Sequence, residues 1–160
     1  MTDNDDFETI RTIVSGTKIA VLTTRASSGE LHSRPLAVLD YPFEGTLWFF
    51  TQDPSPKTDD VANDPQVNVS FSDGKSYLSI AGSASVERNQ TRIDQLWNPM
   101  VEAWFDNGRE DPTVALLRVD ATSAEFWAID KPGVVRAFEI AKAIVTKTTP
   151  DVGENRTVSL

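Results

Sequence analysis

The chain has 160 residues, 39% of them hydrophobic, so it is long enough for one domain that buries roughly two thirds of its unfolded surface. The 15 Lys and Arg residues against 24 Asp and Glu residues give a formal net charge of −9, which excludes non-specific attraction to nucleic acid or to an anionic membrane. The absence of Cys excludes disulfides, thiolate nucleophiles and cysteine-ligated metals. The acidic residues 1–10 lack the apolar segment of a signal peptide, and no apolar run approaches the length of a membrane span. We therefore expect a soluble, cytoplasmic protein.

Hydrophobic periodicity predicts the elements in chain order. A first helix is expected over residues 6–17, with apolar residues on one face and Gly16 at its end. Runs of β-branched and aromatic residues between short polar turns then predict strands at 18–25, 31–39, 46–51, 66–72, 77–88 and 114–130. Further helices are expected at 56–65, at 89–105 as two short helices meeting at Pro99, and at 134–145. Gly82 lies inside a strand and predicts a bulge or bend.

Short turns between successive strands are typical of a meander or small barrel. We therefore predict one α+β domain over residues 1–160, built around an antiparallel β-barrel with short flanking helices. Its core covers about residues 5–145. The polar tail at about 146–160 is expected to be poorly packed at its end.

Most common catalytic patterns are missing from the sequence. His32 is the only histidine, and no Ser lies in a nucleophile elbow, so a serine-hydrolase triad is not expected. The acidic runs lack a histidine partner and the spacing of an EF-hand, so we predict no metal site. The glycines form neither a Walker A loop nor a G-x-G-x-x-G turn.

A phosphate site is one interpretation of the loop after the third strand. Ser55 and Lys57 precede a predicted helix, whose free backbone amides would add to their hydroxyl and ammonium groups, and Arg34 could contribute from a neighbouring strand. The alternative, which composition alone favours, is an exposed loop whose Lys57 balances Asp59 and Asp60.

Pro35 has no amide to donate, which indicates a sheet edge or a bulge and leaves neighbouring backbone groups free for a ligand. Beside it, the aromatic run 48–50 has side chains on both faces of a strand, one of which could stack on a flat ring. Trp127 could act in the same way. For each aromatic residue taken alone, core packing is the commoner role.

Together these residues resemble a known family. The segments "SRPL" (33–36), "WFFTQDPSPK" (48–57) and "YLSIAGSASV" (77–86) resemble the pyridoxamine 5′-phosphate oxidase-like superfamily, an FMN-binding split barrel of six strands. The segment from Leu96 to Asp130 is similar to the bacterial general stress protein branch, with its W-N-P, A-W-F, D-P, L-L-R-V and A-E-F-W motifs. The resemblance spans roughly residues 5 to 145. It implies a homodimer that binds FMN at the subunit interface.

The resemblance also implies a set of cofactor-binding residues. Matched to the family motifs, they are Arg34, Pro35, Leu36, Phe49, Phe50, Thr51, Ser55, Lys57, Trp104 and Trp127. Pro56 stands where the oxidases have the middle arginine of their phosphate clamp, so one cation is missing. The C-terminal segment has no histidine, unlike the substrate-binding segment of those oxidases, so oxidation of pyridoxamine phosphate is not expected.

The leading hypothesis is therefore an FMN-dependent oxidoreductase of unknown substrate, for which no catalytic side chain can be named. A non-catalytic flavin-binding stress protein, acting as a carrier, sensor or scavenger, is the alternative. A deazaflavin or haem-type ligand in the same cleft is a third.

Overall fold

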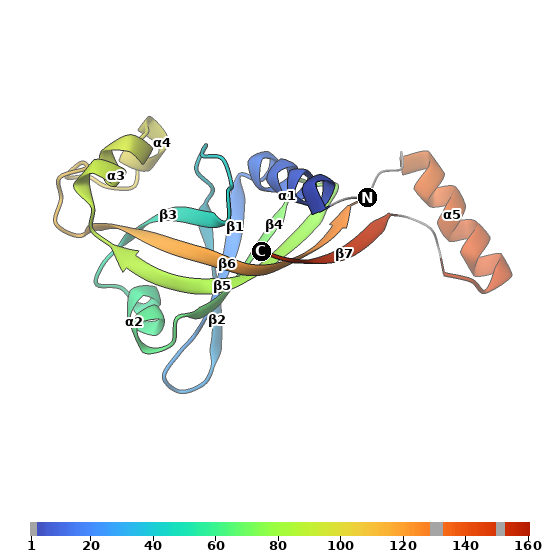
Figure 1. Ribbon diagram of the computed structural model, residues 1–160, viewed down its shortest axis with the longest axis horizontal. Helices are drawn as coiled ribbons and strands as arrows, with labels where there is room; N and C mark the ends of the chain where they lie inside the picture. The colour runs from blue at the N-terminus through green and yellow to red at the C-terminus, as the bar shows by residue number, and fades with distance from the viewer. Residues whose placement is uncertain (1–2, 129–132, 150–152) are drawn as a thin grey trace.

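A computed structural model describes residues 3–128, 133–149 and 153–160 of the chain (Figure 1). The helices are α1 (Asp3–Gly16), α2 (Pro56–Asn63), α3 (Gln90–Leu96), α4 (Pro99–Glu102) and α5 (Gly133–Thr146). The strands are β1 (Ile19–Arg25), β2 (Leu31–Ala37), β3 (Thr46–Gln52), β4 (Gln66–Ser72), β5 (Tyr77–Glu87), β6 (Val114–Ala128) and β7 (Glu154–Ser159). The α+β class and the elements predicted from periodicity are confirmed, except that residues 129 and 130 of the predicted strand 114–130 lie outside the described residues.

The strands form one antiparallel sheet in the order β2-β1-β4-β5-β6-β3, with β7 also paired to β6. The 15-residue β6 is long enough to pair with three strands, because β5 follows one of its edges while β3 and β7 share the other. Strands β2 and β3 lie at the two ends of the path, and no ladder joins them within the described residues. The sheet is therefore curved but not closed, which is the split of a split barrel.

The bulge predicted at Gly82 is confirmed. The register between β5 and β6 shifts between Ala81 and Gly82. A Cβ atom at Gly82 would lie 2.6 Å from the backbone oxygen of Asp120, closer than side-chain atoms approach backbone. Only glycine therefore fits this crossing without displacing β6.

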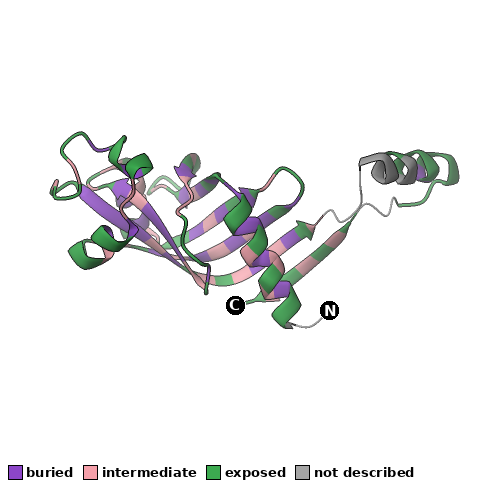
Figure 2. Ribbon diagram, turned by 90° about the horizontal axis from the view of Figure 1, so that it is seen from above, coloured by how far each residue is buried: buried purple, intermediate pink, exposed green. Residues whose placement is uncertain are grey.

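The interior is filled by alternate residues of the strands, which Figure 2 shows as buried positions interleaved with more exposed ones. Ile10, Ile13 and Val14 of α1 pack into this main core, as the first helical pattern predicts. A second, smaller core attaches α3 and α4 to the outer face of β3 and β6. It comprises Trp48, Ile93, Leu96, Val101, Phe105, Val114 and Leu116.

The prediction of six strands and a poorly packed tail is wrong, because the C-terminal residues form a seventh strand, β7, along the free end of β6. Its residues alternate between half-buried and exposed, and Val158 packs against the main core. Arg156 also reaches the buried carboxylate of Asp6 on α1, with Nε 3.4 Å from Oδ1. The polar composition of the segment hid a strand of which only one face meets the core.

Helix α5, predicted from its apolar spacing, stands apart from the sheet in both overall views (Figures 1 and 2). Its Ile140, Ile144 and Val145 side chains are exposed. No helix among the described residues is both long and apolar enough to cross a bilayer. The described residues also contain no group of three or more His, Asp or Glu side chains suited to a metal ion.

Candidate functional site

The split between β2 and β3 contains a cleft of about 500 Å³. Its lining comes from β1–β2, from the end of β3 and the start of α2, and from the α4 segment. These residues are Ile19, Pro35, Leu36, Ala37, Val38, Leu39, Phe50, Thr51, Gln52, Lys57, Asn98, Met100, Val101, Trp104 and Phe105. Most of them are apolar, and the polar Thr51, Gln52 and Lys57 lie where β3 enters α2, with Asn98 beside α4 as the further polar residue. A cleft of this size and composition suits a small organic ligand with one polar end.

The alternation of β3 decides which of its aromatic residues face the cleft. Phe49 is buried in the main core, whereas its neighbour Phe50 lines the cleft. Phe50 is held in place by edge contacts to Trp97 and Phe105, with ring centroids 5.5 and 6.3 Å away. The cleft therefore has one aromatic wall of fixed orientation on β3.

The polar end is built by the N-terminus of α2. The Ser55 hydroxyl accepts from the backbone N–H of Thr58, and the Thr58 hydroxyl accepts from the backbone N–H of Ser55, so the two residues form a capping box. Pro56 occupies the first turn, where its missing N–H and fixed φ suit a helix start. These features fix the position of the following residue, Lys57.

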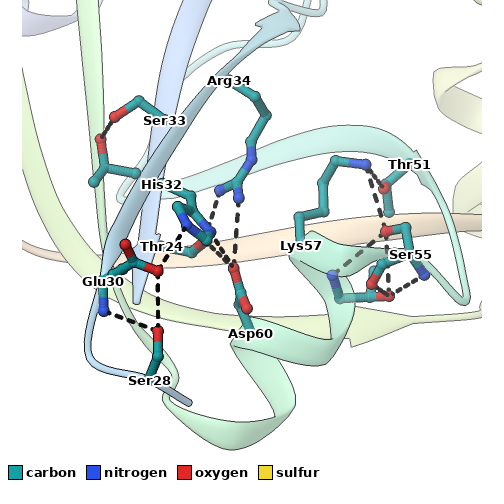
Figure 3. Close-up of polar contacts among 12 residues, drawn as sticks. Thr24, Ser28, Glu30, His32, Ser33, Arg34, Thr51, Ser55, Lys57 and Asp60 are labelled. Atoms are coloured by element: carbon teal, nitrogen blue, oxygen red, sulfur yellow. Dashed lines mark hydrogen bonds and ion pairs between the residues drawn. The ribbon is translucent and has the colours of Figure 1, made fainter. Parts of the chain in front are cut away.

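Lys57 is a half-buried cation with hydroxyl partners. Its Nζ atom donates to Oγ1 of Thr51 at 3.1 Å and lies 3.5 Å from Oγ of Ser55 (Figure 3). The ion pairs within the described parts of the chain include none that Lys57 makes, so it does not balance Asp59 or Asp60. Burial, and then the neighbouring charge of Arg34, lowers the pKa of Lys57. An ammonium group in this state favours an anionic ligand, which would offset its desolvation.

Arg34 lies beside this end of the cleft rather than in its lining. Its guanidinium donates from Nη1 to Oγ1 of Thr24 at 2.6 Å, and its Nη2 is 3.5 Å from Oδ2 of Asp60 (Figure 3). The same carboxylate oxygen accepts from the Thr24 hydroxyl at 2.7 Å, and Nδ1 of His32 lies 4.0 Å from it. His32 is therefore an exposed neighbour of Asp60 at the sheet edge, not part of the cleft wall.

Six of the ten predicted site residues line the cleft. They are Pro35, Leu36, Phe50, Thr51, Lys57 and Trp104. Ser55 adjoins it through Lys57, and Arg34 adjoins it from β2. Phe49 lies in the core with 1% of its surface exposed, and Trp127 lies at the other end of β6, paired with Tyr77 and Asn155. Within one chain, the structure does not bring these last two residues to the cleft.

Sequence reasoning missed part of the wall. Val38, Leu39, Asn98, Met100 and Phe105 also line the cleft. The helical spacing and Pro99 predicted the two short helices of this segment, but spacing does not show which neighbour a helix faces. The Asn98 side chain caps α4 by accepting from the backbone N–H of Val101, and this fixes the orientation of that wall.

Comparison with known proteins places these features in a family. The family described as pyridoxamine 5′-phosphate oxidase like matches residues 5–151. The protein bli-3 of Neurospora crassa is 30% identical over 162 residues, which cover 94% of this chain and 78% of that protein. A candidate general stress protein 26 from Jannaschia sp. CCS1 is 26% identical, with a TM-score of 0.76 over 98% of this chain and 99% of that one. The general stress FMN/FAD binding protein of Xanthomonas citri is 28% identical, with a TM-score of 0.71 over 81% and 92% of the two chains. The chain therefore belongs to the pyridoxamine 5′-phosphate oxidase-like family, in its general stress protein branch.

Proposed function

We propose that the protein binds FMN in the cleft between β2 and β3. The observation that carries the proposal is Lys57, a half-buried ammonium group that has hydroxyl partners and no carboxylate partner in the described parts of the chain. In a chain of net charge −9, an anion needs such a local cation. The flavin phosphate would lie against Lys57 and Ser55, with Arg34 beside them.

The remaining lining residues fit the flat ring of a flavin. Pro35 and Leu36 present the edge strand β2, while Phe50 and Thr51 present β3 on the other side of the cleft. An apolar slot with a few polar groups at one end is the usual form of a cofactor site. The Xanthomonas citri relative, named as an FMN/FAD binding protein, supports a flavin over other flat ligands.

We further propose a homodimer in which the cleft lies at the subunit interface. Met100 and Trp104 line the cleft yet keep 61% and 75% of their surface exposed, and α5 exposes Ile144 and Val145. Exposed aromatic and Met side chains are typical of interfaces. A second subunit would cover them, and Trp127 would then belong to the interface wall. A monomeric mass in light scattering at micromolar concentration would contradict the dimer.

For activity, we propose an FMN-dependent oxidoreductase of unknown substrate. The bound flavin would supply the electron transfer, while the protein orients it and limits its contact with water. One observation favours the alternative of a non-catalytic flavin-binding protein. The described residues that line the cleft include no carboxylate and no imidazole, and Lys57, their one ionisable side chain, is assigned to the phosphate rather than to proton transfer.

The test is a titration of the purified protein with FMN, FAD and riboflavin, followed by flavin absorbance and fluorescence quenching. We expect FMN to bind with its fluorescence quenched by the aromatic wall. A protein that is colourless as purified and binds none of the three would overturn the proposal. Anaerobic mixing of the FMN-loaded protein with NADH and with NADPH then separates the two activities. Bleaching of the flavin by either donor supports the oxidoreductase. A flavin that stays oxidised in the presence of both donors supports the non-catalytic protein.

A further inference from the structure

Asp60 is a largely buried carboxylate that the proposed function leaves unexplained. Its side chain is 12% exposed, and it receives both the Thr24 hydroxyl, at 2.7 Å, and the Arg34 guanidinium, at 3.5 Å. Thr24 itself is 1% exposed and accepts from Arg34 at 2.6 Å. The three side chains thus form a closed triangle in which two terminal nitrogens of Arg34 are each held by a different partner. A guanidinium with two fixed contacts has lost most of its freedom to reorient.

Helix α2 carries both Asp60 and Lys57, the cation without a carboxylate partner among the described residues. Lys57 and Asp60 are three residues apart on α2, so both side chains project from one face of the helix. Figure 3 shows Arg34 reaching down from β2 to Asp60, while Lys57 extends from the preceding turn toward Thr51. Burial lowers the pKa of Lys57, and the nearby charge of Arg34 lowers it further. Two cations therefore lie at this end of the cleft, and of the two only Arg34 is paired with the carboxylate of Asp60.

We propose that Asp60 and Thr24 are positioning residues that hold Arg34 beside Lys57, so that the site recognises a phosphate monoester and prefers FMN to riboflavin. The inference rests on the proposed function, because it concerns the same cleft and its phosphate end. In this role the negative Asp60 strengthens the binding of an anion, because it orients the positively charged Arg34.

The sign of the effect separates this role from two others. If Asp60 positions Arg34, Asp60→Asn weakens FMN binding about tenfold, the scale of one charge-assisted contact, and leaves riboflavin binding unchanged. If Asp60 acts only as a nearby negative charge, the same variant tightens FMN binding. If Asp60 only attaches α2 to β1 and β2, the variant lowers the melting temperature and weakens both flavins equally.

Thr24→Val is the second variant, since it removes the hydroxyl between Asp60 and Arg34 without changing the charge or the size of the side chain. It should also lower the FMN preference over riboflavin. Asp59→Asn is the matched control, because Asp59 is exposed on the same helix and its loss changes the net charge equally. That control should leave the preference as it is in the unaltered protein.

The experiment measures the dissociation constants of FMN and riboflavin by fluorescence quenching for the unaltered protein and the three variants, with a melting temperature for each. A smaller FMN preference in Asp60→Asn and Thr24→Val, but not in Asp59→Asn, supports the inference. Should Asp60→Asn fail to fold, Thr24→Val decides alone. Tighter or unchanged FMN binding in the variants overturns the inference and leaves the proposed function intact. If the unaltered protein binds FMN and riboflavin equally, the inference is also overturned and the proposed function stands. If it binds neither flavin, the inference and the proposed function are both overturned.

Discussion

Replacing Lys57 by Met tests the assignment of the cleft most directly. Met keeps an unbranched apolar stem of four heavy atoms and lacks the ammonium group that contacts Thr51 and Ser55. A hydrogen bond to a charged partner contributes about 1.5–3 kcal/mol, and each 1.4 kcal/mol is tenfold in affinity. We therefore expect Lys57→Met to weaken FMN binding by about 10- to 100-fold.

The stability of the ligand-free protein should respond differently. Burial disfavours the charged form of Lys57, whose pKa lies below the ordinary 10.5. As the pH rises through this lowered pKa toward 10.5, the unfolded chain holds more protons at this position than the folded chain, so folding becomes more favourable. Lys57→Met should remove that alkaline rise and leave the free energy of unfolding at neutral pH unchanged or higher. FMN affinity, in contrast, should fall over the same alkaline range, because the ammonium group is lost.

The assay is a fluorescence titration of FMN at neutral and alkaline pH, with urea unfolding of the ligand-free protein at each pH. Lys75→Met is the matched control, because Lys75 is exposed in the turn between β4 and β5 and does not line the cleft. If Lys57→Met binds FMN within twofold of the unaltered protein, Lys57 is not a phosphate ligand and the reasoning from its burial and missing ion pair is refuted.

Two further predictions concern the sheet. Gly82→Ala should destabilise the protein by about 1–3 kcal/mol in urea unfolding, because the new Cβ would meet the backbone oxygen of Asp120 at 2.6 Å, and Ser85→Ala on the same strand should have little effect. Arg156→Ala should lower the free energy of unfolding by about 1–3 kcal/mol, since it leaves the buried Asp6 carboxylate without the Arg156 cation, and adding Asp6→Asn should recover part of the loss. Equal stability of the Arg156→Ala single variant and the unaltered protein would show that this ion pair does not secure β7.

The sequence predicts local structure well where one physical rule acts alone. Alternation in 66–72 and helical spacing in 6–17 each report a single buried face, and both elements are present as β4 and α1. Pro99 ends one short helix and starts another because it cannot donate in a helix interior. Gly82 also predicts its local structure by a single rule, because a strand interior tolerates glycine poorly unless a bulge requires it.

Prediction fails where a side chain depends on a second element. Both Trp48 and Phe49 are buried, on opposite faces of β3, because α3 and α4 cover the face that would otherwise be open. The strand pattern alone therefore does not show that Phe50, rather than Phe49, lines the cleft. The tail fails for a related reason, because β7 is stabilised by pairing with β6 and by Asp6 rather than by its own polar sequence.

The charged side chains of the cleft lie at one end, where they can bind a ligand but are not placed along the whole of it. Lys57 and Arg34 lie at the end formed by β3 and α2, whereas the α4 segment supplies the apolar side chains of Met100, Trp104 and Phe105. In the proposed complex, a phosphate bound at the first end would leave the apolar walls for the flavin ring, and the described lining residues supply no carboxylate or imidazole to that ring. Protons for a redox reaction would then come from water or from the second reactant. The exposed Met100 and Trp104 side chains would be covered by the second subunit in the proposed homodimer, so substitutions there should weaken dimerisation, whereas substitution of Lys57 should weaken FMN binding.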